Sequence, residues 1–244
     1  MKAIETKALT KQYKTVTAVN GIDLSVEQGE LFALLGVNGA GKTTTIRMLT
    51  CLSTPTSGEG FVNGHSIITE KSEVKRIIGI SPQDTGVAEN LTIRENLEFI
   101  SEIYGFDKEK TAKRTGEMID MFGMKEKENQ RAKTLSGGWK RKLSIAMAII
   151  GEPEILFLDE PTLGLDVLAR RELWKAIEQL KGKMTIVLTT HYMEEAEALS
   201  DRIAVMISGK IAALGTLAEL ESLTGQTGLE NAFVAIAEGG VTAV

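Results

Sequence analysis

Residues 36–44 read Gly36-Val37-Asn38-Gly39-Ala40-Gly41-Lys42-Thr43-Thr44 and fit the phosphate-binding loop (P-loop) pattern G-x-x-x-x-G-K-S/T. The mostly apolar run 30–35 before this loop is typical of a buried strand, and residues 45–49 after it open a helix. The glycines let backbone N–H groups turn toward phosphate oxygens, and the helix N-terminus adds partial positive charge. The pattern places Lys42 at the β- and γ-phosphates and the Thr43 hydroxyl on Mg²⁺. With both flanks correct, a chance glycine-rich turn explains this stretch less well than a nucleotide site does.

The composition limits the classes of protein to which this chain can belong. Its 244 residues suffice for one large domain or two small ones, and its formal net charge of -5 argues against binding nucleic acid through bulk charge. A single cysteine, Cys51, excludes an internal disulfide. The N-terminus lacks the apolar stretch of a signal peptide, and no apolar run approaches the ~18–20 residues that span a bilayer. We therefore expect any membrane role to depend on a partner protein.

The first thirty residues predict β-structure. The β-branched runs 16–19 and 22–26 are expected as two strands joined by a hairpin turn at Asn20-Gly21. Tyr13 stands in a polar stretch beside them. Taken alone, Tyr13 is better explained as a half-exposed strand residue than as a ligand contact.

Residues 77–81 form a second short apolar strand candidate, which ends just before Gln83. In open α/β sheets, ligands bind beyond the carboxyl ends of the strands, which is where Gln83 falls. An ordinary loop glutamine remains the simpler interpretation of this residue in isolation.

From about residue 88 to residue 152 the pattern becomes helical. Thr92-Ile93-Arg94-Glu95 matches a capping box at the start of one helix, and residues 109–122 predict a second. This block is expected as a helical subdomain inserted in an α/β domain that spans residues 1–224. Residues 225–244 are expected to form a short C-terminal helix and a tail, frayed over Glu238-Gly239-Gly240.

A second candidate anion site follows at Leu135-Ser136-Gly137-Gly138, which opens another apolar-periodic helix. An ordinary N-cap with flexible glycines is the alternative. The basic triplet 140–142 just beyond it is expected on a solvated face.

Two carboxylates end the apolar strand candidate 155–158. Adjacent strand residues point to opposite faces, so Asp159 can enter the Mg²⁺ shell while Glu160 faces an attacking water. A surface Asp-Glu pair is the alternative, but beside a P-loop the Walker B interpretation is favoured. His191 ends the strand candidate 185–190 and is predicted to lie at the same sheet edge as Gln83 and Glu160.

These motifs predict an α/β fold: a P-loop NTPase core with a mainly parallel sheet, an antiparallel β subdomain and an inserted helical subdomain. Over nearly its whole length, the chain resembles the ATPase subunit of an ATP-binding cassette (ABC) transporter. The family's motifs occur in order at the P-loop, Gln83, residues 135–138, the Asp159-Glu160 pair, Asp166 and His191.

The resemblance implies a role for each matching position. Tyr13 would stack on adenine, Glu160 would be the general base, His191 would contact the γ-phosphate, and Gln83 would touch the metal or water. The phosphates and Mg²⁺ of ATP would be held by Gly36, Asn38, Gly39, Ala40, Gly41, Lys42, Thr43 and Thr44, with Thr43, Gln83 and Asp159 as the metal-side residues. Two copies would close head to tail around two ATP molecules. Ser136, Gly137 and Gly138 of one copy would then bind the γ-phosphate held by the other, and Asp166 would lie at the interface between them.

The resemblance also implies partners and a location. Residues 55–58, 191–197 and 229–233 resemble exporter ATPases encoded apart from their permease, which act on the cytoplasmic side of a membrane. Trp139 departs from the glutamine most frequent at that position, and we expect its indole to pack against a neighbouring helix. The alternative is an ABC-type ATPase that acts as a mechanical switch on ribosomes or DNA; the acidic balance and the single cassette disfavour it, and no nucleic-acid partner is expected.

Overall fold

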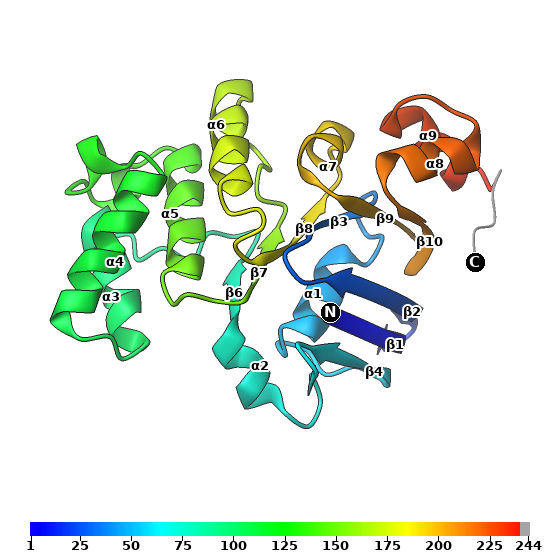
Figure 1. Ribbon diagram of the computed structural model, residues 1–244, viewed down its shortest axis with the longest axis horizontal. Coiled ribbons are helices and arrows are strands. Elements are labelled where there is room, and N and C mark those ends of the chain that lie inside the picture. The colour runs from blue at the N-terminus through cyan, green and yellow to red at the C-terminus, as the bar shows by residue number, and fades with distance from the viewer. Residues whose placement is uncertain (240–244) are drawn as a thin grey trace.

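The computed structural model describes residues 1–239, and its centre is a six-stranded sheet in the order β10-β9-β3-β8-β7-β6 (Figure 1). The strands are β3 (Leu31–Leu35), β6 (Ile78–Ser81), β7 (Ile155–Asp159), β8 (Thr185–Thr190), β9 (Arg202–Ile207) and β10 (Lys210–Gly215). Neighbours pair in parallel from β6 to β9, and only the edge strand β10 is antiparallel. Every residue of β3, β7 and β8 is buried, because helices and a second sheet cover both faces. The predicted mainly parallel core is confirmed.

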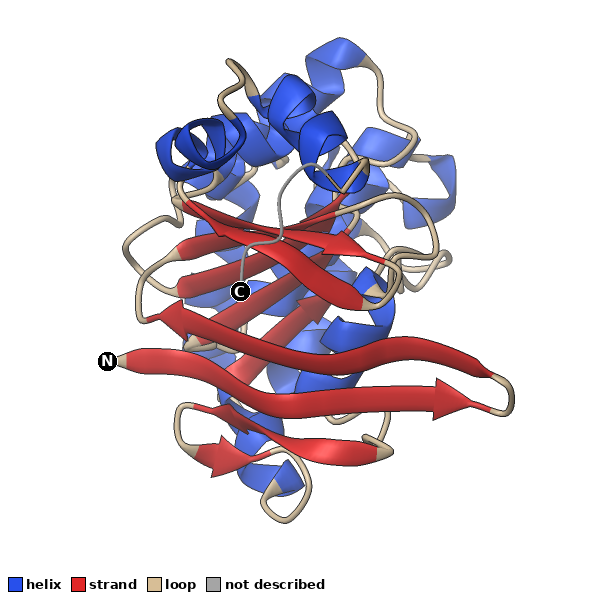
Figure 2. Ribbon diagram, turned by 90° about the vertical axis from the view of Figure 1, so that its right-hand side faces the viewer, coloured by secondary structure: helices blue, strands red, loops and turns tan. Residues whose placement is uncertain are grey.

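A second sheet is antiparallel, in the order β2-β1-β4-β5, and its two long strands cross below the core sheet in Figure 2. It contains β1 (Lys2–Tyr13), β2 (Val16–Glu27), β4 (Ser57–Val62) and β5 (His65–Ser66). The predicted antiparallel β subdomain is therefore also confirmed.

The hairpin predicted at Asn20-Gly21 is wrong, because β2 runs through it as one strand. The pairing with β1 shifts from Lys11 opposite Val19 to Leu9 opposite Ile22, which leaves one extra residue on β2. Gly21 absorbs this bulge with a φ of 62°, and the Asn20 N–H donates to the Gly209 carbonyl at 2.8 Å. A single long partner strand and the neighbouring β9–β10 turn thus override the local turn preference.

The helices fill the space around the two sheets. Helix α1 (Lys42–Leu49) lies between the sheets, whereas α6 (Val167–Glu178) and α7 (Met193–Leu199) lie on the opposite face of the core sheet (Figure 1). The remaining helix near the antiparallel sheet is α2 (Lys71–Ile77). Buried apolar side chains form two clusters, one on each face of the core sheet.

All regular elements between β6 and β7 are helical, as predicted for residues 88–152. They are α3 (Ile93–Ile103), α4 (Lys108–Met121), α5 (Gly137–Ile149) and two short 3₁₀ turns at Lys125–Lys127 and Ala132–Thr134. The Thr92 hydroxyl accepts from the Glu95 N–H and the Glu95 carboxylate accepts from the Thr92 N–H, which confirms the capping box. The exact limits of a separate helical subdomain stay a prediction.

The C-terminal part of the described chain consists of α8 (Leu217–Thr224) and α9 (Leu229–Ala237). The predicted C-terminal helix is α9, and the last part of the predicted tail, residues 240–244, lies outside the described residues. None of the helices within residues 1–239 combines the length and apolar character that crossing a bilayer requires.

Candidate nucleotide site

The carboxyl ends of four neighbouring parallel strands form one edge of the core sheet. The P-loop follows β3, His191 follows β8, Glu160 follows β7 and Gln83 lies two residues beyond β6. A cavity of about 450 Å³ opens there, lined by Tyr13, Ala18, residues 38–44, Gln83, Glu160, Leu163 and His191. This is the position that strand order dictates for a ligand site in an open α/β sheet. Residues from five separate stretches of the chain are thus brought to one pocket.

The P-loop wraps around the start of α1. Gly41 caps this helix with a φ of 110°, and a Cβ at this position would lie 2.4 Å from the Ala18 carbonyl oxygen, so only glycine fits. The Lys42 ammonium group is 5% exposed and donates to the Gly36 and Val37 carbonyls at 2.7 and 3.3 Å. The free N–H groups of a helix N-terminus and a fixed ammonium group together suit a phosphate chain.

The two adjacent carboxylates have different partners. Asp159 Oδ1 accepts from the Thr43 hydroxyl at 3.0 Å and from the Thr189 hydroxyl at 2.6 Å. Glu160 Oε1 lies 3.1 Å from Lys42 Nζ, and Glu160 Oε2 lies 2.7 Å from His191 Nδ1. The predicted division of labour between Asp159 and Glu160 is therefore consistent with the geometry.

Glu160 has an unusual backbone conformation. Its φ is 48°, in the left-handed region that non-glycine residues rarely adopt. Its N–H donates to the carbonyl and the hydroxyl of Thr189 on the neighbouring strand, at 3.1 and 3.0 Å. These bonds hold the left-handed turn, which directs the carboxylate into the pocket, and strain of this kind clusters at functional sites.

Tyr13 and Gln83 both line the cavity. Tyr13 is the last residue of β1 and is 45% exposed, with Lys11 Nζ 5.0 Å from its ring centroid. It is thus a half-exposed strand tyrosine that also lines the pocket, and its contact with a ligand stays a prediction. The Gln83 side chain is exposed, and the Gln83 carbonyl accepts from Arg141 at 2.5 Å.

The second predicted anion site lies apart from this cavity. Ser136 caps α5 and Asp166 caps α6, where its carboxylate accepts from the N–H groups of Leu168 and Ala169. A Cβ on Gly138 would lie 3.2 Å from Ala169 Cβ, so the two helix N-termini are neighbours. Within residues 1–239, the Ser136 hydroxyl makes no capping hydrogen bond to its own helix, and it is exposed. One chain alone therefore leaves Ser136, Gly137, Gly138 and Asp166 outside the P-loop pocket.

Trp139 packs where we expected it. The indole is half-buried against the apolar cluster around α5, with Lys127 Nζ and Lys142 Nζ at 5.3 and 4.8 Å from the ring. The neighbouring Ser136 and Gly137 stay exposed.

The prediction of a solvated basic triplet at residues 140–142 is wrong, since the flanking Lys140 and Lys142 side chains are only 23% and 12% exposed and the middle residue is buried. Arg141 is 5% exposed, and its guanidinium donates to the Pro82 and Gln83 carbonyls. Burial lowers the pKa of Arg141, while the carboxylates of Asp159, Asp84 and Glu195 oppose that shift. The sequence alone does not reveal Arg141, because the arginine cannot be told apart from the lysines on either side of it by residue type.

Thr189 is another residue that sequence reasoning missed. It holds both Asp159 and the backbone of Glu160, and the parallel register places it opposite Asp159. The available signal was the polar Thr189 near the carboxyl end of a strand whose middle is apolar.

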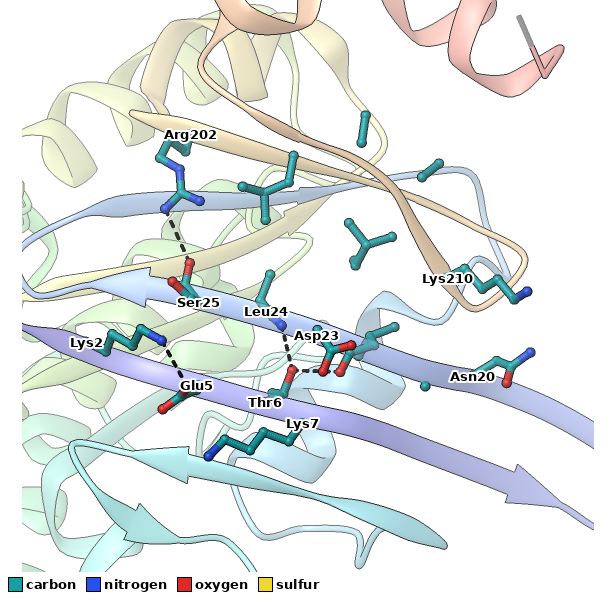
Figure 3. A pocket seen from close by; sticks show the side chains of 16 residues that line it. Lys2, Glu5, Thr6, Lys7, Asn20, Asp23, Leu24, Ser25, Arg202 and Lys210 are labelled. Carbon is teal, nitrogen blue, oxygen red and sulfur yellow. Dashed lines mark hydrogen bonds and ion pairs between the residues drawn. The ribbon is translucent and has the colours of Figure 1, made fainter. Parts of the chain in front are cut away.

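A larger groove lies elsewhere, between the antiparallel sheet and β10 (Figure 3). Its volume is about 860 Å³, and some of its polar groups pair with one another. Lys2 bonds Glu5 at 2.9 Å, and the Thr6 hydroxyl donates to the Ile22 carbonyl at 2.9 Å (Figure 3). None of the predicted site residues lines it, so size does not identify the nucleotide site here.

Behind the pocket, α7 carries a buried carboxyl group. Glu195 is 0% exposed, and its Oε1 accepts from the Trp174 indole N–H at 3.0 Å. Its Oε2 finds no hydrogen-bond partner among the described residues. Burial raises the pKa of Glu195, and the nearby Glu160 carboxylate raises it further.

Glu195→Gln is expected to stabilise the fold increasingly as pH rises. A carboxyl group whose folded pKa exceeds its unfolded pKa is most favourable at low pH, and that stability is lost as pH climbs above the ordinary value of 4.5. Glutamine keeps an acceptor for Trp174 and cannot ionise. Urea unfolding at about pH 5 and about pH 8 measures the effect. If the free energy of unfolding depended on pH identically in the parent and the variant, ionisation of Glu195 would not destabilise the fold.

Several known proteins are similar to this chain over most of its length. Residues 19–163 match the family model described as ABC transporter. The daunorubicin/doxorubicin resistance ATP-binding protein DrrA of Streptomyces peucetius is 43% identical over 92% of this chain and 68% of its own length. The linearmycin resistance ATP-binding protein LnrL of Bacillus subtilis is 40% identical over 91% of this chain and 72% of its own length. The human phospholipid-transporting ATPase ABCA3 is 40% identical, but the chain spans only 13% of it.

Two solved structures show the same architecture. An ATP-binding subunit of an ABC transporter superposes with a TM-score of 0.86 at 29% sequence identity. The superposition covers 96% of this chain and 99% of that subunit's chain. The cassette MJ0796, in a dimeric post-hydrolysis state bound to ADP and Pi, gives a TM-score of 0.80 at 26% identity over 88% of this chain and 98% of its own. With the P-loop pocket, the two carboxylates and the histidine at one sheet edge, the chain belongs to the ABC transporter family and is one of its nucleotide-binding ATPase cassettes.

Proposed function

We propose that this chain is the ATP-hydrolysing subunit that powers export through a separate membrane permease, working as a dimer of two copies. One observation carries the proposal: two anion-binding elements suited to one nucleotide lie apart in a single chain. The pocket holds the P-loop, whereas Ser136 and Asp166 are exposed at neighbouring helix N-termini outside it. A second copy, turned head to tail, would bring its own Ser136 to the open side of each pocket. The dimeric state of MJ0796 supports this arrangement.

The pocket residues divide between the parts of ATP. The Tyr13 ring, exposed at the end of β1, would stack on the adenine, and the N–H groups of residues 39–44 would bind the phosphates. Oxygen ligands suit Mg²⁺, and the Thr43 hydroxyl and the Asp159 carboxylate, 3.0 Å apart, would hold it, with the Gln83 amide as a further candidate in the same pocket. Mg²⁺ bound there would neutralise charge on the phosphates.

Glu160 would activate the attacking water. In the described structure its two oxygens pair with Lys42 and His191. Phosphate oxygens would compete for Lys42, which would free Glu160 Oε1 to take a proton from water while His191 keeps the carboxylate in place. The water oxygen would then attack the γ-phosphorus, the bond to the β-γ bridging oxygen would break, and Lys42 would stabilise the charge that leaves with ADP.

The surface around the second anion site suits contact with another copy. Leu163, Val167 and Leu168 are 37%, 60% and 75% exposed beside Asp166. Exposed apolar residues that adjoin an open polar site favour a protein interface.

Ser136→Ala is expected to weaken ATP-dependent dimerisation. The hydroxyl would lose a hydrogen bond to a charged phosphate, which is worth about 1.5–3 kcal/mol, so the dimer dissociation constant should rise at least tenfold. Static light scattering with ATP in a hydrolysis-deficient background measures this constant. Thr216→Ala is the matched control, since it removes a helix cap on α8 far from the proposed interface. Equal dimerisation of the parent and Ser136→Ala would refute the role of Ser136.

A different surface suits the permease. Leu52 beyond α1, and Phe99, Ile103 and Tyr104 at the end of α3, are 42–65% exposed. Leu52 and Tyr104 line a cleft of about 460 Å³, together with Ile80, Ile100 and Met147 among others. This surface is expected to meet a membrane partner, which would hold the chain at the cytoplasmic face of the membrane. The names of DrrA and LnrL favour a drug-like cargo, and the permease would select it.

Membrane association separates this proposal from the ribosome or DNA switch. Expressed with its permease, the chain is expected to float with membrane vesicles on a sucrose gradient, and Ile103→Glu should release it. Leu223→Glu on α8, where Leu223 is 39% exposed, is the matched control and should remain bound. Sedimentation with ribosomes or DNA in place of membranes would favour the switch instead.

A further inference from the structure

One face of α5 packs tightly along β6. A Cβ on Gly79 would lie 2.1 Å from the Ala148 carbonyl, so the strand and the helix touch at backbone distance. Two residues on, the Ser81 hydroxyl lies 2.9 Å from the Ser144 hydroxyl, and both are buried. Alternate strand residues thus meet helix residues on one stripe, and this fixes α5 against β6.

Arg141 extends this stripe toward the nucleotide. It lies three residues before Ser144, and its guanidinium donates to the Pro82 carbonyl at 2.6 Å and the Gln83 carbonyl at 2.5 Å. Both bonds are charge-assisted and nearly excluded from solvent, since Arg141 is 5% exposed. The backbone of residues 82–83 just after β6, called the Gln83 loop below, is therefore held by α5 itself.

The same helix begins at the second anion site. Ser136 caps α5 five residues before Arg141, a separation of roughly 7 Å along the helix axis. Gln83 lines the pocket of its own chain, whereas Ser136 lies outside it. A rigid helix with Arg141 in its first turns therefore links the two places at which one copy would meet two different nucleotides.

We propose that Arg141 is a positioning residue that couples the two ATP sites of the dimer, by making the Gln83 loop and the N-terminus of α5 move together. The inference rests on the proposed head-to-tail dimer. A shift of the Gln83 loop when ATP fills one pocket is passed through the two hydrogen bonds to Ser136, which contacts the nucleotide of the other pocket. Lysine cannot replace arginine, because one ammonium group does not span both carbonyls as the planar fork does.

The test compares three variants by the Hill coefficient of ATP hydrolysis. For the parent this coefficient is expected to exceed unity, with an upper limit of about two, the number of sites. Arg141→Gln and Arg141→Lys are expected to lower it toward unity while a single copy binds ATP as the parent does. Arg141→Lys keeps the positive charge and so keeps the test valid if Arg141→Gln folds poorly.

Arg114→Gln is the matched control. Arg114, on α4, donates to the Ile149 and Ile150 carbonyls at the other end of α5 and is 16% exposed. Arg114 thus also donates guanidinium hydrogen bonds to two backbone carbonyls beside α5, but it does not contact the Gln83 loop. Its loss should therefore leave cooperativity intact. If Arg114→Gln lowered the Hill coefficient as much as Arg141→Gln, general loosening of α5 would explain the result and the inference would fall.

Two further outcomes separate this inference from the proposed function. A parent that dimerises with ATP yet shows a Hill coefficient of unity, or an Arg141→Lys variant with full cooperativity, would overturn the coupling role and leave the dimer standing. A parent that binds ATP but never dimerises would overturn the proposed function, and the coupling with it.

Discussion

Glu160→Gln is expected to lower kcat for ATP hydrolysis by about 10²–10⁴-fold, the range that a general base contributes, while ATP still binds. Glutamine keeps the shape of the side chain and an acceptor for the His191 ring, but it cannot take a proton from water. Because hydrolysis is what would reopen the dimer, this variant should accumulate as an ATP-bound dimer. Single-turnover hydrolysis measures the rate, and size-exclusion chromatography with ATP measures the dimer.

Glu195→Gln is the matched control for this experiment. It also replaces a buried carboxyl group near the pocket, but Glu195 lies behind the site and does not line the cavity. Its hydrolysis rate should stay close to that of the parent. Hydrolysis by Glu160→Gln at the parent rate would remove Glu160 from the role of general base.

Lys42→Ala is expected to abolish most ATP binding and to destabilise the free protein. A hydrogen bond from a charged group is worth about 1.5–3 kcal/mol, so ATP affinity should fall by roughly 10–100-fold. Lys42 and Glu160 also form a buried ion pair, with side chains 5% and 7% exposed. Removing one partner of such a pair costs about 3–5 kcal/mol, and the His191 contact of Glu160 places the expected loss at the low end.

The double variant Lys42→Ala/Glu160→Gln separates the two effects. Without a buried negative charge to leave unpaired, its free energy of unfolding should recover toward that of the parent, while ATP binding stays lost. Urea denaturation measures the first quantity and calorimetric titration with ATP the second. If Lys42→Ala bound ATP normally, the P-loop would not be the phosphate site.

Much of the fold and the site could be predicted because most of the motifs lie just beyond the carboxyl end of a buried strand. The P-loop, Gln83, Glu160 and His191 each follow an apolar run, and parallel strands place their carboxyl ends at one edge. Pairing order and register, by contrast, depend on residues far apart in the chain. Asn20-Gly21 has strong local turn chemistry, yet β1 and the Gly209 carbonyl make it a bulge within one strand.

The supporting contacts of the site could not be predicted for the same reason. Thr189 and Arg141 act through the backbone of elements distant in sequence, and neither belongs to a motif with its partner. The separation of Ser136 from the P-loop pocket also required the structure, since order along the chain says nothing of which copy completes a site. That separation is what makes two copies necessary in this account.

A crystal structure of the Glu160→Gln variant grown with ATP and Mg²⁺ tests the central claim most directly. The account predicts a two-fold dimer in which the Ser136 hydroxyl and the N–H groups of Gly137 and Gly138 lie within hydrogen-bond distance of a γ-phosphate held by the Lys42 of the other copy. A closed, ATP-bound assembly with residues 136–138 far from either triphosphate would contradict it.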